Sequence, residues 1–406
     1  MRPRGRLAIR RLALARAISV TGSNAAAIAL SYEVFRQTGS PIWLSASLFF
    51  TLGVTGLLAP LAGSLVDRTS RKALLIASDA AGASCWLALV FVHRPAVLIG
   101  LGFLASVAEL PFVPASGAAV PNLVDDEQDL TWANARLSVA NNVGHLLGPS
   151  LGGLLATAGG ASLVFLLNAL SFVASAGLVA RVHGSFSADP DAAPIEAGAA
   201  SGFRQLLRNP VVLRIAVAST ALYLAVDMTL VADVPLARSF GWGAVGYGLM
   251  DAFWGGGALL GALLASRVVA QAESLAMVGG TAVIALGFAA ASAAPWFALV
   301  LGGILLASAS DAIGDVAAQG IVQRQTPDAS RGRVLAALSG AGLLANAVGF
   351  VFAGFAVSAL GPRGIYAVAA GTVIAATFVL GSTLPRFSTA RVRSAAGRAT
   401  VTAAPR

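Results

Sequence analysis

The segment GSLVDRTSRK, residues 63–72, lies between two hydrophobic runs at residues 43–61 and 73–92. It carries four charges, at Asp67, Arg68, Arg71 and Lys72, in a chain of 406 residues that is 57% hydrophobic and only 11% charged. Soluble domains contain about 25% charged residues, and the mean hydropathy here is +0.80. The segment is therefore interpreted as a short polar turn between two stretches that belong in a lipid bilayer.

Twelve runs are long and apolar enough to cross a bilayer, which takes about 20 residues of helix. They centre on residues 12–35, 42–65, 73–93, 96–119, 132–157, 161–181, 211–235, 244–266, 275–294, 296–321, 334–359 and 364–384. Their hydrophobicity is continuous and not alternating, which favours helices over strands, and helices satisfy their backbone groups without water. We therefore predict an all-α integral membrane protein with twelve transmembrane helices.

The basic residues, almost all arginine, are distributed unevenly between the connections. One side collects the arginines of the two termini, of residues 63–72 and of most other turns, whereas the opposite side has only Arg36, Arg94, Arg238 and Arg363. Because basic loops are retained in the cytoplasm, we expect a multi-pass protein of the bacterial inner (cytoplasmic) membrane with both termini cytoplasmic. A nucleic-acid partner is not expected, because the net charge of +9 is scattered between apolar runs instead of forming one basic face.

The longest connection divides the spans six plus six. We expect an N-terminal six-helix bundle at residues 1–182 and a C-terminal bundle at 210–385. The cytoplasmic linker at 183–209 is rich in small residues and proline and ends in GFRQLLRNP, which is typical of a short amphipathic helix at a membrane surface. A disordered basic tail is expected at 386–406.

The two halves share short sequence matches in the same order. LASVAE at 104–109 is followed by LASASD at 306–311, and ANNVG at 140–144 by ANAVG at 345–349. GSLVDR at 63–68 has a weaker counterpart, GALLASR, at 261–267. Matches that keep the order of the spans indicate two pseudo-symmetric six-helix bundles.

This organisation resembles the major facilitator superfamily over essentially the whole chain. Residues 63–72 match its cytoplasmic turn G-x-L-a-D-R-x-G-R-K, with Ser70 in place of glycine, and GHLLGPSLGG at 144–153 matches G-x-x-x-G-P-x-x-G-G, typical of its proton-driven exporters. TGSP at 38–41, the stretch 113–135 and QTPDASRGRV at 325–334 resemble the macrolide-efflux and enterobactin-exporter branch. The arginine that many drug exporters carry in span 4 is absent, so proton coupling through it is not carried over.

The polar turn is predicted to act as a conformational latch, formed by Gly63, Asp67, Arg68, Arg71 and Lys72. A carboxylate such as Asp67 is favoured at the N-terminus of a neighbouring helix, and the resemblance implies that this helix is span 11. Arg71 is free to pair with the acidic cluster at 125–127. The alternative is purely topological, with the basic residues only holding the turn in the cytoplasm.

The element at 144–153 is predicted to be a flexing motif, because a proline inside a helix removes a hydrogen bond and glycines permit close packing. Its residues are Gly144, Gly148, Pro149, Gly152 and Gly153. The alternative is a packing kink without bias toward export. His145, within the motif, is expected to be packed or hydrogen-bonded.

Ionisable side chains inside membrane spans are functional hypotheses by default. Glu109 and Asp311 lie midway along spans 4 and 10 and are related by the repeat; Asp227 lies in span 7, and the repeat places Asn24 of span 1 opposite it. Asp315 follows Asp311 by one helical turn, and two carboxylates so close resist joint ionisation.

The resemblance implies that spans 1, 4, 7 and 10 line one central cavity, so these five residues are predicted to couple protons or bind substrate. The alternative is structural hydrogen bonding to neighbouring helices. Asp79, Asp233 and Asp251 lie nearer to span ends and are expected to brace the bundles.

Motifs of enzymes are missing from the connections, which contain no phosphate-cradling loop, HExxH, CxxC or nucleophile elbow. We therefore expect no enzymatic activity, no cofactor and no metal. The sequence favours a proton-coupled secondary active exporter, an antiporter of a small amphipathic or hydrophobic compound, functional as a monomer. The alternatives are an uptake transporter of the same fold, a channel and a non-transporting membrane sensor.

Overall fold

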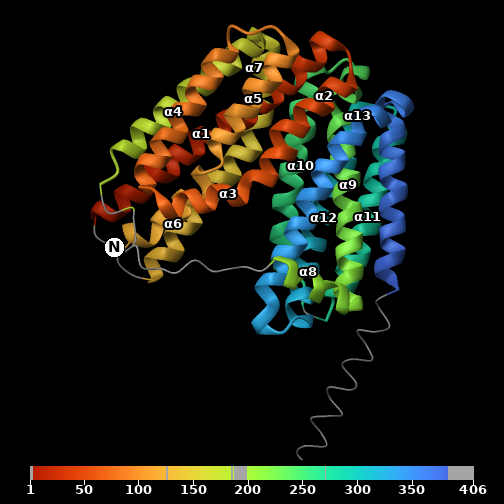
Figure 1. Cartoon of the computed structure of the whole chain (residues 1–406). Coiled ribbons are helices and arrows are strands. Elements are labelled where there is room, and N and C mark those ends of the chain that lie inside the picture. The colour runs from red at the N-terminus through yellow and green to blue at the C-terminus, as the bar shows by residue number, and fades with distance from the viewer. Residues whose placement is uncertain (1–2, 125–126, 184–185, 187–198, 270, 383–406) are drawn as a thin grey trace, which may run out of the picture.

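The computed structural model describes residues 3–124, 127–183, 186, 199–269 and 271–382, and the regular elements within these ranges are helices (Figure 1). The N half comprises α1 (Pro3–Thr38), α2 (Pro41–Leu48), the π-helical segment η1 (Phe49–Val54), α3 (Thr55–Arg68), α4 (Arg71–Leu89), α5 (Pro95–Glu109), α6 (Phe112–Leu123) and α7 (Glu127–Ala180). The C half comprises α8 (Ala199–Arg208), α9 (Pro210–Ser239), α10 (Gly243–Ala265), α11 (Glu273–Ala293), α12 (Phe297–Gln325) and α13 (Asp328–Gly381).

Ten helical segments of the described residues are long and apolar enough to cross a membrane, and two of them, α7 and α13, are hairpins. Each reverses at a single non-helical residue, Gly160 (φ 75°) in α7 and Gly361 (φ 69°) in α13. Positive φ is readily adopted by glycine and disfavoured for other residues. Counted as two spans each, the hairpins bring the total to the predicted twelve, and the predicted all-α fold is confirmed.

Two predicted spans contain breaks that hydrophobicity alone does not reveal. Span 2 is built from α2, η1 and α3, and span 4 from α5 and α6. The second break falls at Leu110 and Pro111, directly after Glu109. Proline has no N–H group to continue the helical ladder, so Glu109 stands at the end of a helix near the middle of the span.

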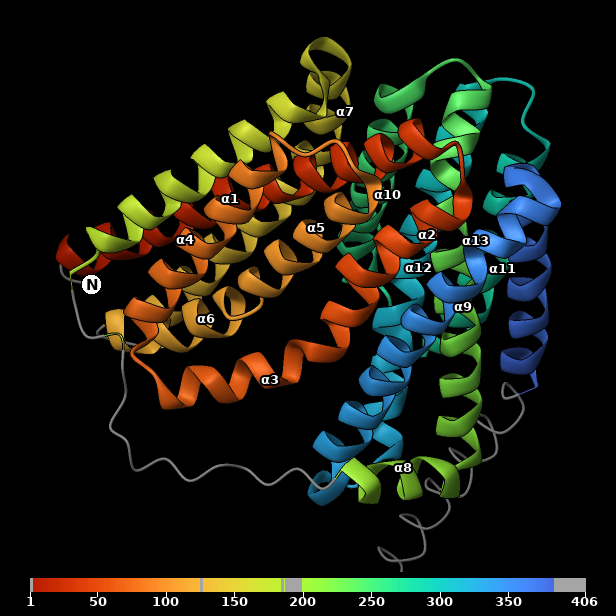
Figure 2. The same ribbon diagram turned by 45° about the horizontal axis from the view of Figure 1, so that its top comes forward.

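The two halves meet at one end of the molecule and diverge toward the other (Figures 1 and 2). They diverge toward the end that carries the N-terminus and α8, called the α8 end below; the opposite end, where α7 turns at Gly160, is called the hairpin end. Near the hairpin end Ser45 donates a hydrogen bond to the carbonyl oxygen of Phe350 and accepts one from the N–H of Gly354 (3.1 Å). These contacts join α2 to α13 and close the hairpin end.

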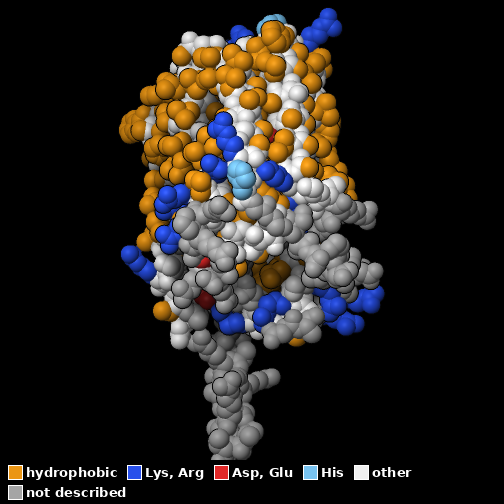
Figure 3. Space-filling model, turned by 90° about the vertical axis from the view of Figure 1, so that its left-hand side faces the viewer, with side chains coloured by type: hydrophobic (Ala, Val, Ile, Leu, Met, Phe, Trp, Pro, Cys, Tyr) orange, Lys and Arg blue, Asp and Glu red, His pale blue; other side chains and the backbone are white. Residues whose placement is uncertain are grey.

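The outer surface is apolar over much of its area. Figure 3 shows hydrophobic side chains over much of one side of the N half, with many of the Lys and Arg side chains over its lower part. Phe91 and Phe378 are both 76% exposed, and such exposure is expected where the surroundings are lipid and not water. The arrangement suits a protein embedded in a bilayer.

Helix α8 crosses the ends of the C-half helices (Figure 2). Leu206 is buried against the C half, whereas Phe203 and Leu207 are about half exposed, and the helix also carries Arg204 and Arg208. It occupies the place of the predicted amphipathic helix. Residues 184–185 and 187–198 of the predicted linker, and the predicted tail at 386–406, lie outside the described residues.

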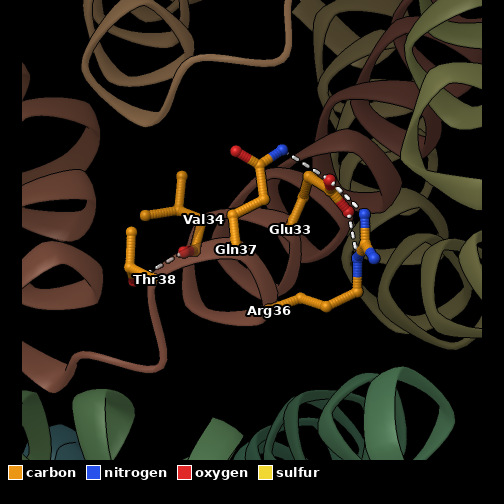
Figure 4. Close-up of polar contacts among 5 residues, drawn as sticks. All are labelled: Glu33, Val34, Arg36, Gln37 and Thr38. Carbon is orange, nitrogen blue, oxygen red and sulfur yellow. Dashed lines mark hydrogen bonds and ion pairs between the residues drawn. The ribbon is translucent and has the colours of Figure 1, made fainter.

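At the hairpin end, α1 finishes in a local network of polar contacts (Figure 4). Arg36 donates to both carboxylate oxygens of Glu33 (2.8 and 2.7 Å), and the amide of Gln37 donates to one of them (2.7 Å). The hydroxyl of Thr38 donates to the carbonyl oxygen of Val34 (2.8 Å). Glu33 is thus fully engaged by its own helix, which separates it from the acids considered below.

Candidate substrate and proton site

A cavity of about 350 Å³, called the central cavity below, lies between the two halves. Residues of α1, α2, η1, α3, α4, α5 and α7 form most of its wall, and α9 and α10 of the C half complete it. Its ionisable lining groups are Arg16, Glu109, His145, Tyr247 and Asp251. A cavity bounded by both halves is where a bound molecule can sense their relative movement.

Glu109 is the best-defined acid of the central cavity. The hydroxyl of Ser23 on α1 donates to Oε2 (2.9 Å), and the indole Nε1 of Trp86 on α4 donates to Oε1 (3.3 Å). The break after α5 leaves this carboxylate at a helix end, where side chains of two other helices reach it. The structure therefore places the predicted acid on the cavity wall with both oxygens oriented.

Arg16 was missed in the sequence analysis and lies beside Glu109. Its Nη2 donates to Oδ1 of Asn141 on α7 (2.8 Å), and its guanidinium lies 5.4 Å from the centre of the Phe112 ring. The charges of Glu109 and Asp79 both act on it. An arginine within a predicted span was a usable signal, but only acidic residues were considered at membrane depth.

Asp79 on α4 is fully buried, with 0% of its surface exposed. Neither carboxylate oxygen makes a hydrogen bond within 3.5 Å among the described residues. The hydroxyl of Ser175 on α7 is a neighbour, and the charges of Glu109 and Arg16 act on Asp79 as well. The expectation that Asp79 braces a span end is therefore replaced by a place in an interior cluster. This cluster, Arg16, Asp79 and Glu109, is called the N-half charge cluster below.

Asn24 lines the central cavity and contacts His145 of α7. The amide nitrogen of Asn24 donates to the carbonyl oxygen of Val20 (2.8 Å), which leaves its Oδ1 to accept from Nδ1 of His145 (3.2 Å). This pairing requires the proton on Nδ1. His145 is hydrogen-bonded, as expected, and faces the cavity instead of being packed away.

The equivalent contact in the C half involves Asp227. Asp227 is 4% exposed and faces α13. With the Asn346 amide oriented to satisfy its surroundings, its nitrogen donates to Oδ2 of Asp227 (2.9 Å) and to the carbonyl oxygen of Gly342 (3.1 Å). The central cavity includes Leu230 of the same helix but not Asp227. Asp227 is therefore buried in the contact between α9 and α13.

Asp311 and Asp315 line a different cavity, of about 280 Å³, called the C-half cavity below. It is enclosed by α9, α11, α12 and the end of α13, without any N-half residue in its lining. Asp315 is exposed and its Oδ2 accepts from the amide of Gln319 (2.8 Å). The four predicted acids thus do not share one cavity, because the pseudo-symmetry places Asp311 inside its own half, as it places Glu109 in the other.

The flexing motif forms two helix contacts at once. A Cβ added at Gly144, Gly148 or Gly152 would lie 2.7 Å or less from an atom of α1, so these glycines let α1 and α7 touch. Pro149 and Gly153 pack on α10 of the other half, against Gly248 and Ala244 respectively. The motif therefore lies between the central cavity and the contact of the two halves.

The contacts also correct the register of the repeat. Gly148 packs on Asn24, and Gly349 packs on Asp227 in the same way, with an added Cβ 2.7 and 3.0 Å from the Cβ atoms of these residues. Gly349 is therefore equivalent to Gly148. The match of ANNVG with ANAVG had paired Gly349 with Gly144, one helical turn away.

The described residues of the predicted latch make their contacts within the N half. Arg71 donates to the carbonyl oxygens of Ala118 (2.9 Å) and Phe186 (3.1 Å), and Lys72 donates to those of Ala180 and Val182. Arg71 is thus engaged by carbonyl oxygens. Its predicted pairing with the acidic cluster at 125–127 is not tested, because Asp125, Asp126 and the side chain of Glu127 lie outside the described residues, as do the surroundings of Gly63, Ser64, Asp67 and Arg68.

Comparison with known proteins adds an independent observation. The family model of the Major Facilitator Superfamily matches residues 12–271 and 215–404, which together span nearly the whole chain. The chain belongs to the Major Facilitator Superfamily. It is therefore a multi-pass membrane transporter of a small-molecule substrate and not an enzyme, and the resemblance noted from its motifs is confirmed.

Relatives within the superfamily carry the names of exporters. The chain is 28% identical over 377 residues to the multidrug efflux pump Tap of Mycolicibacterium fortuitum, covering 84% of this chain and 87% of that protein. It is 28% identical over 360 residues to the enterobactin exporter EntS of Escherichia coli, covering 86% and 84%. For BacE of Bacillus subtilis, named as a bacilysin exporter, identity is 23% over 236 residues, and the match covers only 58% of that protein.

Solved structures of the superfamily fold are similar over almost the whole chain. A bacterial homologue of the lysosomal transporter Spinster, in an inward-facing unoccupied conformation, superposes with a TM-score of 0.68 at 14% identity, over 94% of this chain and 95% of that one. A bacterial homologue of ferroportin gives 0.69 at 16% identity, over 92% and 98%. At these identities the similarity establishes the fold alone.

Proposed function

We propose that the protein is a proton-coupled secondary active exporter, which exchanges protons for a small amphipathic or hydrophobic compound by alternating access. The observation that carries the proposal is Glu109, a carboxylate held by Ser23 and Trp86 on the wall of a cavity that both halves enclose. A charge change at this point acts where the halves meet. The relatives named as efflux pumps and exporters support the direction of transport.

The side of the membrane follows from the arginine distribution. The α8 end carries the basic N-terminal stretch, the polar turn and the arginines of α8, so we assign it to the cytoplasm of a bacterium, with both termini on that side. The halves diverge toward this end and are joined at the hairpin end by Ser45 of α2 and Phe350 of α13. The structure then corresponds to an inward-open state, and a single chain suffices for transport.

The N-half charge cluster supplies a means of coupling. Arg16 is one cation shared by two carboxylates, those of Asp79 and Glu109. One proton bound by the two acids leaves the cluster neutral, which is the less costly state for groups removed from water. Loss of that proton on the cytoplasmic side restores the charge, and a charge that is better accommodated in one arrangement of the halves shifts their populations.

The experiment is transport in inverted membrane vesicles from an efflux-deficient host, with a panel of lipophilic dyes and antibiotics. The wild-type protein is expected to accumulate a compound when a proton gradient is imposed and to stop when an uncoupler is added. Glu109→Gln is expected to insert normally and lose the proton-driven part. Glu33→Gln is the matched control, because its carboxylate is engaged by its own helix at the hairpin end.

Unchanged proton-driven accumulation by Glu109→Gln would remove Glu109 from the coupling role. Accumulation in right-side-out vesicles, with none in inverted ones, would reverse the direction and favour an uptake transporter. Binding of a compound without any accumulation in either orientation would instead identify a sensor.

A further inference from the structure

The pseudo-repeat allows the C-half cavity to be compared with the same place in the N half. In the N half Ser78 donates to the carbonyl oxygen of Ala108, and in the C half Gly280 packs on the carbonyl oxygen of Ser310. These contacts make Ser78 equivalent to Gly280 and Ala108 equivalent to Ser310. The residues that directly follow them in the chain are then equivalent as well. Thr281 thus corresponds to Asp79, and Asp311 corresponds to Glu109.

The same comparison identifies the counterpart of Arg16. Gly148 and Gly349 are equivalent because each lies about twelve positions before the turn glycine of its hairpin, Gly160 or Gly361. Asn24 and Asp227, on which these two glycines pack, are therefore equivalent as well. Arg16 lies eight positions before Asn24, and Ser219 lies eight positions before Asp227. Ser219 therefore stands in the C half where the N half has an arginine.

The hydrogen-bond partner of Arg16 in the N half is also replaced by a smaller residue in the C half. Asn141, which accepts from Arg16, lies seven positions before Gly148, and Gly342 lies seven positions before Gly349. Where the N half has a guanidinium and an amide, the C half has a serine hydroxyl and a hydrogen atom. The ring of Tyr223 packs over Gly342. The space that an arginine at position 219 would enter belongs to the C-half cavity, because Ser219 lines it.

The charge of the C-half cavity is one-sided. Asp311 and Asp315 both line it, and none of the described residues in its lining is Arg, Lys or His. Tyr223, 43% exposed, adds an aromatic ring and a hydroxyl, and its neighbours include both aspartates. The N half places one cation, Arg16, near its two acids, whereas the lining of the C-half cavity provides acids and room without a cation.

We propose that the C-half cavity binds one organic cationic group, an ammonium or a guanidinium-like group of the transported compound, in the place that the Arg16 guanidinium takes in the N half. Carboxylates form their strongest hydrogen bonds with such groups, and Tyr223 adds the face that a cation prefers. The remaining wall is largely apolar, from Ile215, Leu222, Met277, Ile284 and Leu380, and suits the hydrocarbon next to the charge.

A metal ion fits the cavity less well than an organic cation. Calcium takes six to eight oxygen ligands and magnesium six in a strict geometry, and two carboxylates among apolar side chains supply few of them. A volume of about 280 Å³ also exceeds what a single ion needs. The identity of the cation as part of the transported compound rests on the proposed function, but the binding itself does not.

The test is direct binding of p-aminobenzamidine, a small fluorescent aromatic cation, to the purified full-length protein in detergent. Its neutral isostere, 4-aminobenzamide, has the same shape without the charge. We expect the wild-type protein to bind the cation at least about tenfold more tightly than the amide, since hydrogen bonds to charged groups are stronger than those between neutral groups. Excess methylguanidinium should displace the probe, and sodium or magnesium chloride at the same ionic strength should not.

Two variants locate the site. Ser219→Arg introduces an arginine at the C-half position that is equivalent to Arg16. Its side chain should occupy the cavity, so that binding of p-aminobenzamidine falls at least about tenfold. Asp311→Asn should reduce it by a similar factor, and it carries the test alone if Ser219→Arg is not monodisperse on size exclusion. Glu33→Gln, which also removes one carboxylate but at the hairpin end, should bind as the wild type does.

Equal binding of the cation and the amide, or equal binding by the wild type and both variants, would overturn this proposal. Displacement by magnesium alone would overturn it too, in favour of a metal site. These outcomes are separate from the fate of the proposed function: a protein that binds the probe in this cavity but shows no proton-driven transport contradicts only the proposed function, and one that transports without binding it contradicts only this inference.

Discussion

Replacing Arg16 by leucine tests the N-half charge cluster most directly. The substitution removes the hydrogen bond to Asn141 and the contact with the Phe112 ring, and it leaves Asp79 and Glu109 without their shared cation. A hydrogen bond of a charged group contributes about 1.5–3 kcal/mol. Because the two carboxylates also lose the nearby positive charge, we expect the upper end, about 3 kcal/mol.

For a folding unit of about 150–250 residues, roughly the size of one half, each kcal/mol lowers the melting temperature by about 2–4 °C. Arg16→Leu should therefore melt about 6–12 °C below the wild type, which thermal denaturation followed by size-exclusion chromatography in detergent measures. Arg10→Gln is the control, because Arg10 is an exposed arginine of the same helix.

Two further stability measurements distinguish the loss of an electrostatic interaction from a simple loss of packing. The deficit of Arg16→Leu should be smaller at pH 5 than at pH 8, because protons bound by the two acids replace the missing positive charge. Adding Glu109→Gln should restore part of the stability, with a coupling of more than about 1 kcal/mol. A variant as stable as Arg10→Gln, or a deficit independent of pH and of Glu109, would refute the cluster.

Three other substitutions test the packing and the movement of the halves. Gly148→Val should destabilise the protein by about 1–3 kcal/mol, because an added Cβ already meets α1, whereas Gly100→Val, at a position with no neighbour within 4 Å, should melt as the wild type does; equal melting of the two would contradict the close contact. Ser45→Ala removes two hydrogen bonds across the hairpin end, worth about 0.5–1.5 kcal/mol each, so spin-label distances between α2 and α13 should show more of the outward-open population, and an unchanged distribution would exclude this closure. Asp67→Asn should insert normally but transport more slowly if the latch operates, and transport at the wild-type rate would refute it.

The fold could be predicted from the sequence because each span is specified by a long apolar run within one continuous stretch of the chain. Continuous apolar runs define the spans, and the hairpin turns fall within about three residues of the predicted ends of spans 5 and 11. The breaks inside spans 2 and 4 were not predicted, because a π-helical segment or a helix end at Pro111 does not change hydrophobicity. Glu109 was placed correctly at mid-span, but its position at a helix end depends on that break.

The site was predicted only in part, for two physical reasons. Interior position depends on which face of a helix packs inward, so Asp79, expected near a span end, proved fully buried, and Arg16 was not considered. The depth of a residue also says nothing about which cavity it faces, and Asp311 and Glu109 proved to line separate cavities. Small residues recur along these helices, and matching Gly349 with Gly144 by sequence alone is therefore wrong by one turn, as the packing on Asp227 shows.

The single-residue turns at Gly160 and Gly361 have a mechanical consequence. Because the turn is one residue long, the two helices of each hairpin in α7 and α13 cannot move independently where they are joined. A displacement of one helix at the turn must move the other, so separation of the halves at that end requires rotation of whole bundles rather than sliding of single helices. Lengthening either turn by a few flexible residues would uncouple the two helices, and we expect it to reduce the amplitude of the conformational change without disturbing the cavities.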